Sequence, residues 1–241
     1  MTARGIILTR PIGYNSALMR RITEAGYHGV ERPLLTIEEV ELDEVAKQQV
    51  INLDQYHVVV FVSRNAVRFG MPHLTKLWPQ WPERLTWCAV GSQTAEALRR
   101  YDLNAIYPVN EGAEGLLSTM DRQGTENVLI VRGKGGLETL RDGLEALSIT
   151  VDYLEVYERV GNPHVTLNQE VLDLRLDVVV LLSGDVAEPL CESINGDVLS
   201  EMTLVVPSER VKEILVAKGL HKILVSGSTS DDAILTTLAS I

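Results

Sequence analysis

The order of motifs in the N-terminal part of this chain is repeated in its C-terminal part. ILTRPIGYNSALMRRITEAG aligns with LIVRGKGGLETLRDGLEALS, VVVFVSRNAV with VVVLLSGDVA, and CAVGSQTAEALRR with LVVPSERVKEILVAKG. The equivalent residues are Arg10 and Arg132, Ser63 and Ser183, and Ser92 and Ser208. A repeat of about half the chain predicts two similar lobes, and a cleft between similar lobes is where a ligand normally binds.

Short β-rich runs alternate with segments whose apolar residues have helical spacing. Parallel strands need crossover connections, so this alternation predicts parallel sheets with helices on both faces. We therefore predict an α/β fold of two similar doubly wound parallel-sheet lobes from an internal duplication, joined by two interlobe strands. The expected strands are Ile6–Thr9, His28–Arg32, Val58–Val62, Leu85–Val90, Ala105–Val109, Val128–Val131, Val151–Leu154, Val178–Leu182, Thr203–Val206 and Ile223–Ser226.

Two segments mix apolar and acidic residues in an extended pattern and are predicted to link the lobes. They are LLTIEEVEL, residues 34–42, and YLEVYERVG, residues 153–161. A third segment, PHLTKLWPQWPER at residues 72–84, is rich in Pro and Trp and has no counterpart in the second half. We expect it to be a surface elaboration before a strand.

Composition narrows the class of partner and the compartment. Of the 241 residues, 45% are hydrophobic and 23% are charged, which is ordinary for a soluble globular protein. No apolar run approaches the length of about 18 residues typical of a membrane span, and the N-terminus lacks a signal-peptide pattern. The two cysteines lie in different halves, which fits a reducing compartment. We predict a cytoplasmic protein with no membrane partner.

The net charge of the chain and the spacing of its His and Cys residues argue against nucleic-acid binding and against a metal site. The formal net charge of −11 disfavours nucleic acid, because the phosphates would be repelled. The five histidines are scattered and no C-x₂-C or H-x₃-H spacing occurs, so no metal site is expected. The glycine-rich segment RGKGGLETL does not complete a dinucleotide fingerprint, because Glu138 stands where the third glycine is needed. No P-loop or G-x-S-x-G motif occurs, which argues against NTPase and hydrolase chemistry.

The candidate binding residues lie where strands are predicted to end and helices to begin. In parallel sheets ligands bind beyond these carboxyl ends, where helix N-termini expose backbone N–H groups that suit an anion such as a polycarboxylate. The alternative for the serines is a plain helix cap, and for the two arginines a structural ion pair. The candidate substrate-binding residues are Arg10, Ser63, Arg64, Asn65, Ser92, Thr94, Arg132, Gly133, Ser183, Gly184 and Ser208.

Tyr157 is the candidate catalytic residue. It lies in the second linking segment, in EVYER, where an amphipathic phenol can face a cleft and donate or relay a proton. The alternative is an interface tyrosine whose ring is buried and whose hydroxyl faces water.

Nine motifs in sequence now resemble the uroporphyrinogen-III synthase family. They extend from about Ile6 to Leu238 and read ILTRP, FVSRNAV, AVGSQTAEAL, EGAEGLL, VLIVRGKGGLETL, VYER, LLSGDV, VVPSERVKEIL and SGSTSDDAIL. The resemblance implies a cofactor-free lyase that cyclises hydroxymethylbilane, a linear polycarboxylate tetrapyrrole, to uroporphyrinogen III. Water is lost and ring D is inverted in this step of tetrapyrrole biosynthesis. The resemblance also implies a monomer that can receive its substrate from the upstream deaminase.

The resemblance further implies which segments form each lobe and which residues act. One lobe would comprise residues 1–34 with 162–241 and the other residues 35–161, although the repeat alone equally allows two contiguous lobes. Tyr157 would be the acid that assists departure of the hydroxymethyl oxygen, and Thr94 would supply a substrate-contacting hydroxyl. Some members have two adjacent threonines where this chain has Ser208 and Glu209.

Two other functional classes fit parts of the pattern. A non-catalytic two-lobe module that binds or senses a small anion or a tetrapyrrole would have the same repeat and the same anion-suited loops. A nucleotide-sugar or dinucleotide enzyme would require the glycine fingerprint that Glu138 interrupts.

Overall fold

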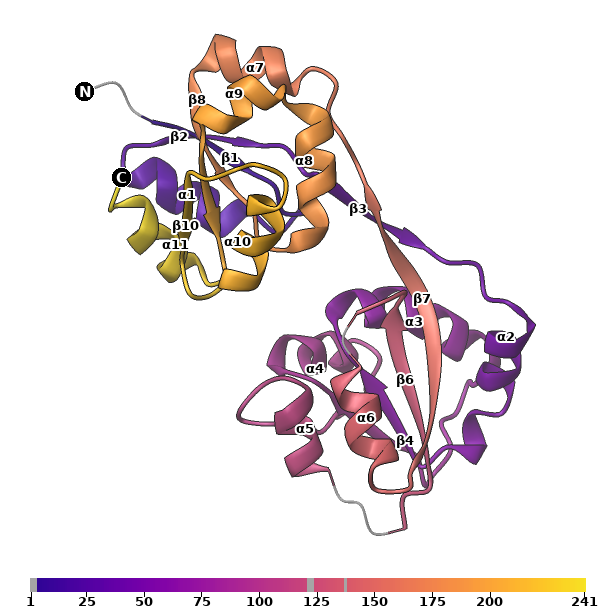
Figure 1. Cartoon of the computed structure of the whole chain (residues 1–241). Coiled ribbons are helices and arrows are strands. Elements are labelled where there is room, and N and C mark those ends of the chain that lie inside the picture. The colour runs from indigo at the N-terminus through magenta and orange to yellow at the C-terminus, as the bar shows by residue number, and fades with distance from the viewer. Residues whose placement is uncertain (1–3, 121–123, 137) are drawn as a thin grey trace. The chain divides into compact units, whose positions relative to one another are not determined.

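The computed structural model describes residues 4–120, 124–136 and 138–241 of the chain. Its contacts divide the chain into two compact units, Met1–Thr36 with Val160–Ile241, and Ile37–Arg159. The chain passes from the first unit to the second within β3 (Leu35–Glu39) and returns within β7 (Thr150–Gly161), as Figure 1 shows. The first unit is therefore built from both ends of the sequence.

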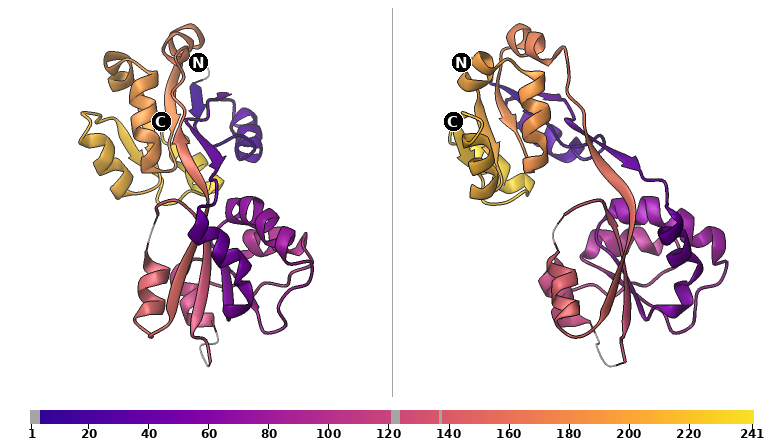
Figure 2. Two further views of the ribbon diagram at one scale, coloured as in Figure 1. Left: turned by 90° about the vertical axis from the view of Figure 1, so that its right-hand side faces the viewer. Right: turned by 45° about the vertical axis from the view of Figure 1, so that its right-hand side comes forward.

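The first unit contains a sheet with the strand order β10-β9-β8-β1-β2. All its pairings are parallel. Helices α7 to α10 pack on one face with η2, and α1 and α11 pack on the other (Figure 2). The strands are β1 (Gly5–Leu8), β2 (His28–Glu31), β8 (Leu176–Val180), β9 (Thr203–Val206) and β10 (Ile223–Val225). The helices are α1 (Ser16–Glu24), α7 (Leu167–Leu174), η2 (Gly184–Val186), α8 (Ala187–Ser193), α9 (Gly196–Glu201), α10 (Glu209–Val216) and α11 (Asp231–Leu238).

The second unit contains a sheet with the strand order β3-β7-β6-β4-β5. Its β4, β5, β6 and β7 pair in parallel, with β6 between β4 and β7. Helices α2, α3 and α4 cover one face with η1, and α5 and α6 cover the other. The added strands are β4 (Val58–Phe61), β5 (Thr86–Ala89) and β6 (Asn127–Gly133). The helices are α2 (Glu44–Ile51), η1 (Leu53–Gln55), α3 (Arg64–Leu77), α4 (Ser92–Arg99), α5 (Ala113–Thr119) and α6 (Thr139–Glu145).

Both sheets thus follow the α/β plan with parallel strands that the sequence predicts. Their registers also correspond. Ile7 lies beside Val179 in the first sheet, and Leu129 lies beside Val59 in the second. These are equivalent residues of the sequence repeat, although the equivalent strands occur in a different order along the chain.

The strand β3 pairs with β7 where the chain crosses between the units. The Val40 amide donates to the Val156 carbonyl, and the Asn162 amide donates to the Leu34 carbonyl. Residue numbers rise along one strand as they fall along the other, so this pair is antiparallel. The crossing segments are therefore hydrogen-bonded strands, as the mixed apolar and acidic pattern predicts.

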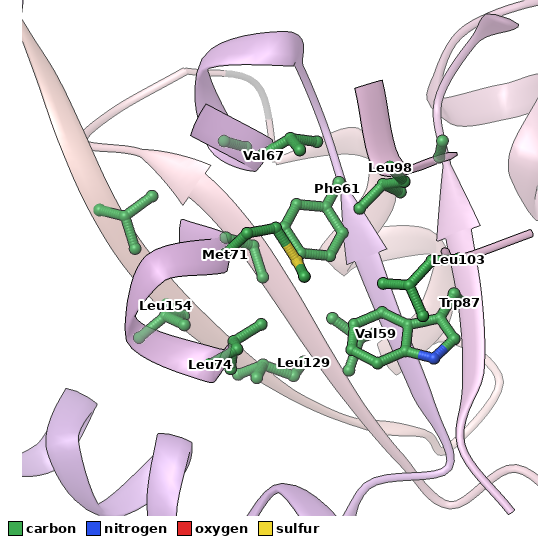
Figure 3. Packing of buried hydrophobic residues seen from close by; sticks show 14 of the residues in the cluster. Val59, Phe61, Val67, Met71, Leu74, Trp87, Leu98, Leu103, Leu129 and Leu154 are labelled. Carbon is green, nitrogen blue, oxygen red and sulfur yellow. The ribbon is translucent and has the colours of Figure 1, made fainter. Parts of the chain in front are cut away.

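The core of the second unit lies on both faces of its sheet. Val59 and Phe61 pack with Met71 of α3 on one face, and Val58 and Val60 pack with the opposite cluster. Figure 3 shows Phe61 and Met71 in the first of these clusters. Successive side chains of a strand point to opposite faces, so burial of both faces requires the uninterrupted apolar run of β4.

Two sequence expectations are corrected. The expected strand Ala105–Val109 is reduced to an isolated bridge between Ile106 and Cys88, and Val109 is almost fully exposed. Pro108 lacks the N–H that would extend such a ladder. Part of residues 72–84 is not a surface elaboration, because α3 extends to Leu77 through Pro72. Trp81 also packs edge-on against Trp87, with ring centroids 4.9 Å apart.

Within the described parts of the chain, no helix is long and apolar enough to cross a membrane.

Candidate active site

A cavity of about 270 Å³ lies in the second unit, at the end of the sheet where β4 and β6 finish. The carboxyl ends of parallel strands meet at the same edge, which is where ligands bind in open α/β sheets. The residues that line the cavity come from strand ends, from two glycine-containing loops and from β7. They are Val62, Val90, Gly112, Ala113, Ile130, Arg132, Gly133, Gly135, Gly136, Leu140, Tyr153, Tyr157 and Arg159.

Tyr157 is placed by an irregularity in the pairing of β6 with β7. Arg132 lies beside Glu155, but the next residue, Gly133, lies beside Tyr157, so Val156 is skipped. Such a bulge changes the direction in which the following side chain points. The Tyr157 side chain is 2% exposed, and its ring centroid lies 6.0 Å from that of Phe69. The phenol is therefore held by packing on one side and borders the cavity on the other.

Gly133 leaves room for the Tyr157 ring. A Cβ atom built on Gly133 would lie 2.4 Å from Cε2 and 2.6 Å from Cζ of Tyr157. Both distances are shorter than any that a real Cβ atom adopts. The glycine at this position is required by the close approach of an aromatic ring.

Ser63 contacts the Tyr157 hydroxyl, with Oγ and the phenol oxygen 3.0 Å apart. Ser63 is also the N-cap of α3, where its Oγ accepts a hydrogen bond from the Ala66 amide at 3.0 Å. Because Ser63 Oγ accepts the hydrogen bond from the Ala66 amide, its own hydroxyl proton remains free to be donated to Tyr157. In that arrangement the phenol proton of Tyr157 is available to a group in the cavity.

The guanidinium of Arg132 is occupied by its own loop. Arg132 is 5% exposed, and its Nη1 lies 3.0 Å from Oε1 of Glu138. The same side chain donates to the carbonyl oxygens of Gly133 and Gly135, and its guanidinium lies 4.3 Å from the Tyr153 ring centroid. Arg132 therefore fixes the loop at residues 133–136 against β7.

Glu138 and Tyr153 complete this network. The Tyr153 hydroxyl donates to the Glu138 carboxylate, and this bond, together with the Arg132 ion pair, lowers the pKa of Glu138. Burial and the same hydrogen bond raise the pKa of Tyr153 to about 12. Arg141 lies over the Tyr153 ring at 3.8 Å from its centroid. Glu138 is thus ionised and Tyr153 is protonated at neutral pH.

Arg159 lies two residues after Tyr157 in β7 and also lines the cavity. Its side chain is exposed, and its guanidinium lies 5.7 Å from the Tyr157 ring centroid. Among the described residues, no carboxylate forms an ion pair with Arg159.

The N-terminus of α4 is occupied by a carboxylate of this chain. The amide and the hydroxyl of Ser92 donate to Oε1 of Glu111 at 2.7 and 2.6 Å, and these bonds lower the pKa of Glu111. Thr94, in the first turn of the same helix, is 5% exposed. The backbone at this helix start is therefore suited to a carboxylate.

The other candidates in this unit lie in the first turn of α3, after Ser63. Arg64 is exposed, and Asn65 is partly buried. The structure thus brings Ser63, Arg132, Gly133 and Tyr157 together, with the start of α3 beside them.

The remaining candidates belong to the first unit and act there as caps and as an ion pair. Arg10 donates to Asp231 and to the Thr229 carbonyl, both at 2.8 Å. Ser183 caps η2 by accepting from the Asp185 amide at 3.3 Å, and Gly184 begins that helix. Ser208 caps α10. These contacts are the structural alternatives that the sequence left open.

Four residues around the cavity were not singled out from the sequence. Arg159 and Tyr153 share β7 with Tyr157, and even spacing along that strand is a signal that could have identified Arg159. In the sequence, Glu138 stands out only through its place in the interrupted glycine fingerprint. Glu111 is remote in sequence from Ser92, so only the fold joins them.

The groups at the site are ones that can transfer a proton and bind an anion. A buried phenol with a hydroxyl neighbour borders a partly apolar cavity, and an exposed guanidinium lies at 5.7 Å from the phenol ring. Within the described parts of the chain, no group of three or more His, Cys, Asp or Glu side chains is arranged to hold a metal ion.

Comparison with known proteins shows which family this chain is similar to. The family model "Uroporphyrinogen-III synthase HemD" matches residues 16–236. A protein named uroporphyrinogen-III synthase from Proteus mirabilis is 31% identical over 165 residues, which cover 67% of this chain and 83% of that protein. A protein of the same name from Escherichia coli strain K12 is 28% identical over 244 residues, which cover 97% of this chain and 99% of that protein.

Solved structures agree in fold. A mutant uroporphyrinogen III synthase from the extremely thermophilic bacterium Thermus thermophilus has a TM-score of 0.63 at 17% identity and covers 99% of this chain and 100% of its own. The Helicobacter pylori uroporphyrinogen-III synthetase has a TM-score of 0.62 at 19% identity, with 98% of this chain and 99% of its own covered.

Proposed function

The chain belongs to the uroporphyrinogen-III synthase family, and we propose that it carries out this family's reaction at the cavity beside Tyr157. The activity is that of a lyase that cyclises hydroxymethylbilane to uroporphyrinogen III in porphyrin biosynthesis. The family match over residues 16–236 is the observation that carries this function. The contacts of Tyr157 support the location of the chemistry.

Tyr157 acts as the general acid that starts the reaction. The pyrrole nitrogen lone pair of ring A expels the oxygen of the hydroxymethyl group on that ring, and this oxygen takes the phenol proton and leaves as water. The products of this step are a ring A azafulvenium cation and a Tyr157 phenolate. A general acid of this kind contributes about 10²–10⁴ in rate.

Ser63 stabilises the phenolate that this step creates. Its Oγ is fixed by the Ala66 amide and lies 3.0 Å from the phenol oxygen, so it can donate to the phenolate without moving. The proton returns to Tyr157 when ring closure releases one from the substrate. Tyr157 is therefore regenerated at the end of each turnover.

Control of conformation distinguishes this enzyme from spontaneous ring closure. The azafulvenium cation can close directly without inverting ring D, whereas inversion requires the substituted carbon of ring D to meet the ring A methylene and form a spiro intermediate. Positioning of bound groups can supply about 7–11 kcal/mol in favourable cases. The loops that begin α3, α4, η2 and α10 position substrate carboxylates, through the residues Arg64, Asn65, Ser92, Thr94, Ser183, Gly184 and Ser208. Arg132 holds the loop at residues 133–136, and Arg10 is held by Asp231 and the Thr229 carbonyl.

The two units are proposed to derive from an internal duplication, with lobes of residues 1–34 plus 162–241 and 35–161. The matching order of four equivalent strands, β9-β8-β1-β2 in one sheet and β5-β4-β6-β7 in the other, supports this origin, as do the equivalent pairs Ile7–Val179 and Leu129–Val59. We further propose that the protein is a cytoplasmic monomer that receives its substrate from the upstream deaminase. Free Cys88 and Cys191 are consistent with a reducing compartment.

A coupled assay tests the proposed function. Hydroxymethylbilane is generated in situ, the products are oxidised, and porphyrin isomers I and III are separated by chromatography. Isomer III as the main product is the expected result. Isomer I alone, formed at the spontaneous rate by folded protein, would refute the synthase activity and favour a non-catalytic tetrapyrrole-binding module.

A further inference from the structure

We propose that the cavity in the second unit is a subsite for one pyrrole ring of the substrate, and that Arg159 binds a carboxylate of that ring. This inference rests on the proposed function, because it assigns a part of the same substrate to a particular residue. The sequence does not identify Arg159 as a candidate. Its assignment depends on which cationic side chains near the cavity already have partners.

The other cations around the cavity are already engaged. Arg132 is 5% exposed and is held by Glu138 and by loop carbonyl oxygens. Lys134 lies 3.5 Å from Glu158, and Arg141 packs on the Tyr153 ring. Each of these contacts reduces the capacity of the cation to bind an incoming anion.

Arg159 differs from these cations in both exposure and partners. Its side chain is exposed, it lines the cavity, and among the described residues it has no carboxylate partner. The contact with the Tyr157 ring, at 5.7 Å from the guanidinium carbon to the centroid, orients it over the candidate acid. A guanidinium presents a fork of N–H donors that matches a carboxylate, and it remains charged at any working pH.

The size and walls of the cavity indicate what accompanies the carboxylate. Sites for drug-sized ligands occupy about 300–1,000 Å³, so a cavity of about 270 Å³ accommodates one ring rather than a linear tetrapyrrole. Val62, Val90, Ile130 and Leu140 give it apolar walls. A flat aromatic pyrrole can bury its faces against these walls while its acidic side chain reaches the mouth.

A carboxylate held by Arg159 would also place its ring beside Tyr157. The two residues are separated by one position in β7, and side chains two apart in a strand point to the same face. The ring whose carboxylate binds Arg159 is therefore the ring that the phenol of Tyr157 can reach.

Steady-state kinetics of three variants test the role of Arg159. Arg159→Gln is expected to raise KM about 10- to 100-fold, the usual effect of losing a hydrogen bond to a charged group, and to change kcat less than about threefold. Arg159→Lys keeps the charge but loses the fork and should lie between wild type and Arg159→Gln. Arg100→Gln removes the same charge from an exposed arginine of the second unit that does not line the cavity, and its KM should stay at the wild-type value.

A salt series separates binding from a structural effect. The KM of the wild-type enzyme should rise with ionic strength, and Arg159→Gln should reduce that dependence, whereas Arg100→Gln should not. A loss of folding would instead lower the fraction of active enzyme and thus kcat at unchanged KM. Equal KM values for wild type and Arg159→Gln, with isomer III still formed by both, would overturn the subsite while leaving the proposed function intact.

A direct binding experiment complements the kinetics. The probe is a monopyrrole with one acetate and one propionate side chain, titrated into the full-length protein and followed by amide NMR shifts. Shifts at residues that line the cavity, such as Gly133 and Gly136, are expected for wild type and are expected to weaken at least tenfold in affinity for Arg159→Gln. Shifts confined to other surfaces, or equal affinity for the two proteins, would contradict the subsite.

Discussion

Gly133→Ala tests whether the packing between Gly133 and Tyr157 sets the geometry of the acid. The added Cβ would lie 2.4 Å from Cε2, 2.6 Å from Cζ and 2.9 Å from Cδ2 of Tyr157, whereas an ordinary contact is 3.4–4 Å. The ring must therefore move by about 1 Å. The Ser63–Tyr157 oxygen distance of 3.0 Å would then increase to about 4 Å, beyond a hydrogen bond.

Gly133→Ala is expected to lower both the free energy of unfolding and the rate of turnover. Overpacking of this kind costs about 1–3 kcal/mol in the free energy of unfolding. Misplacement by about 1 Å costs about 100-fold in turnover. Gly133 does not have a left-handed backbone conformation, so the alanine introduces a steric change and not a backbone strain.

The measurements are urea unfolding and the rate of isomer III formation. Gly196→Ala is the matched control, because no atom lies within 4 Å of a Cβ built at Gly196, and it should change both quantities little. The double variant Gly133→Ala/Tyr157→Phe tests whether the loss of rate in Gly133→Ala arises through the phenol of Tyr157. If Gly133 acts through the phenol, the double variant should be about as slow as the slower single variant.

Two outcomes would refute this reasoning. One is wild-type turnover in Gly133→Ala with the same free energy of unfolding, which would mean that the ring is free to move without consequence. The other is a double variant whose loss of rate is the product of the two single losses, which would mean that Gly133 does not act through Tyr157.

Three further predictions follow from the same contacts. Tyr157→Phe should slow isomer III formation about 10- to 100-fold while unfolding changes by only about 1 kcal/mol, and wild-type turnover would remove this phenol from the mechanism. Ser63→Ala should cost about 1 kcal/mol in urea unfolding through loss of the α3 cap and should also reduce kcat, whereas an unchanged kcat would exclude phenolate stabilisation. The pKa of Glu138 is lower in the folded state than its ordinary value of 4.5, so its ionised form contributes stability above that pH, and this contribution is lost as the pH falls through the folded-state pKa. Urea unfolding of wild type and Glu138→Gln should therefore differ most near neutral pH and converge in acid, and a difference that widens in acid would contradict this assignment.

Local pattern was sufficient to predict much of the second sheet. The run at Val58–Val62 predicts a strand buried on both faces, and β4 is one. Ser63 follows that strand as a candidate cap and does cap α3. Where pattern misled, a competing contact explains the outcome. Val67, Met71 and Leu74 share one buried helix face that extends past Pro72, so packing keeps α3 continuous through the proline.

The role of each charged side chain could not be obtained from the sequence. Arg10 and Arg132 are equivalent in the repeat, but Arg10 pairs with Asp231 from the far end of the chain, and Arg132 pairs with Glu138 six residues away. Arg159 was not identified, and the structure shows it at the cavity without a carboxylate partner among the described residues. Ion pairs depend on which residues meet in space, and sequence spacing reports only neighbours within one element.

By itself, the sequence determined most of the elements, the repeat and the strand ends that carry hydroxyl and glycine residues, because these follow from periodicity over a few residues. The tertiary structure decided between contiguous and discontinuous lobes, which the repeat alone left open, and it shows that the chain enters the second unit at β3 and leaves it at β7. It also decided that a bulge sets Gly133 beside Tyr157. Strand register is fixed by packing and hydrogen bonding between segments distant in the chain, and the local period of either strand does not contain that information.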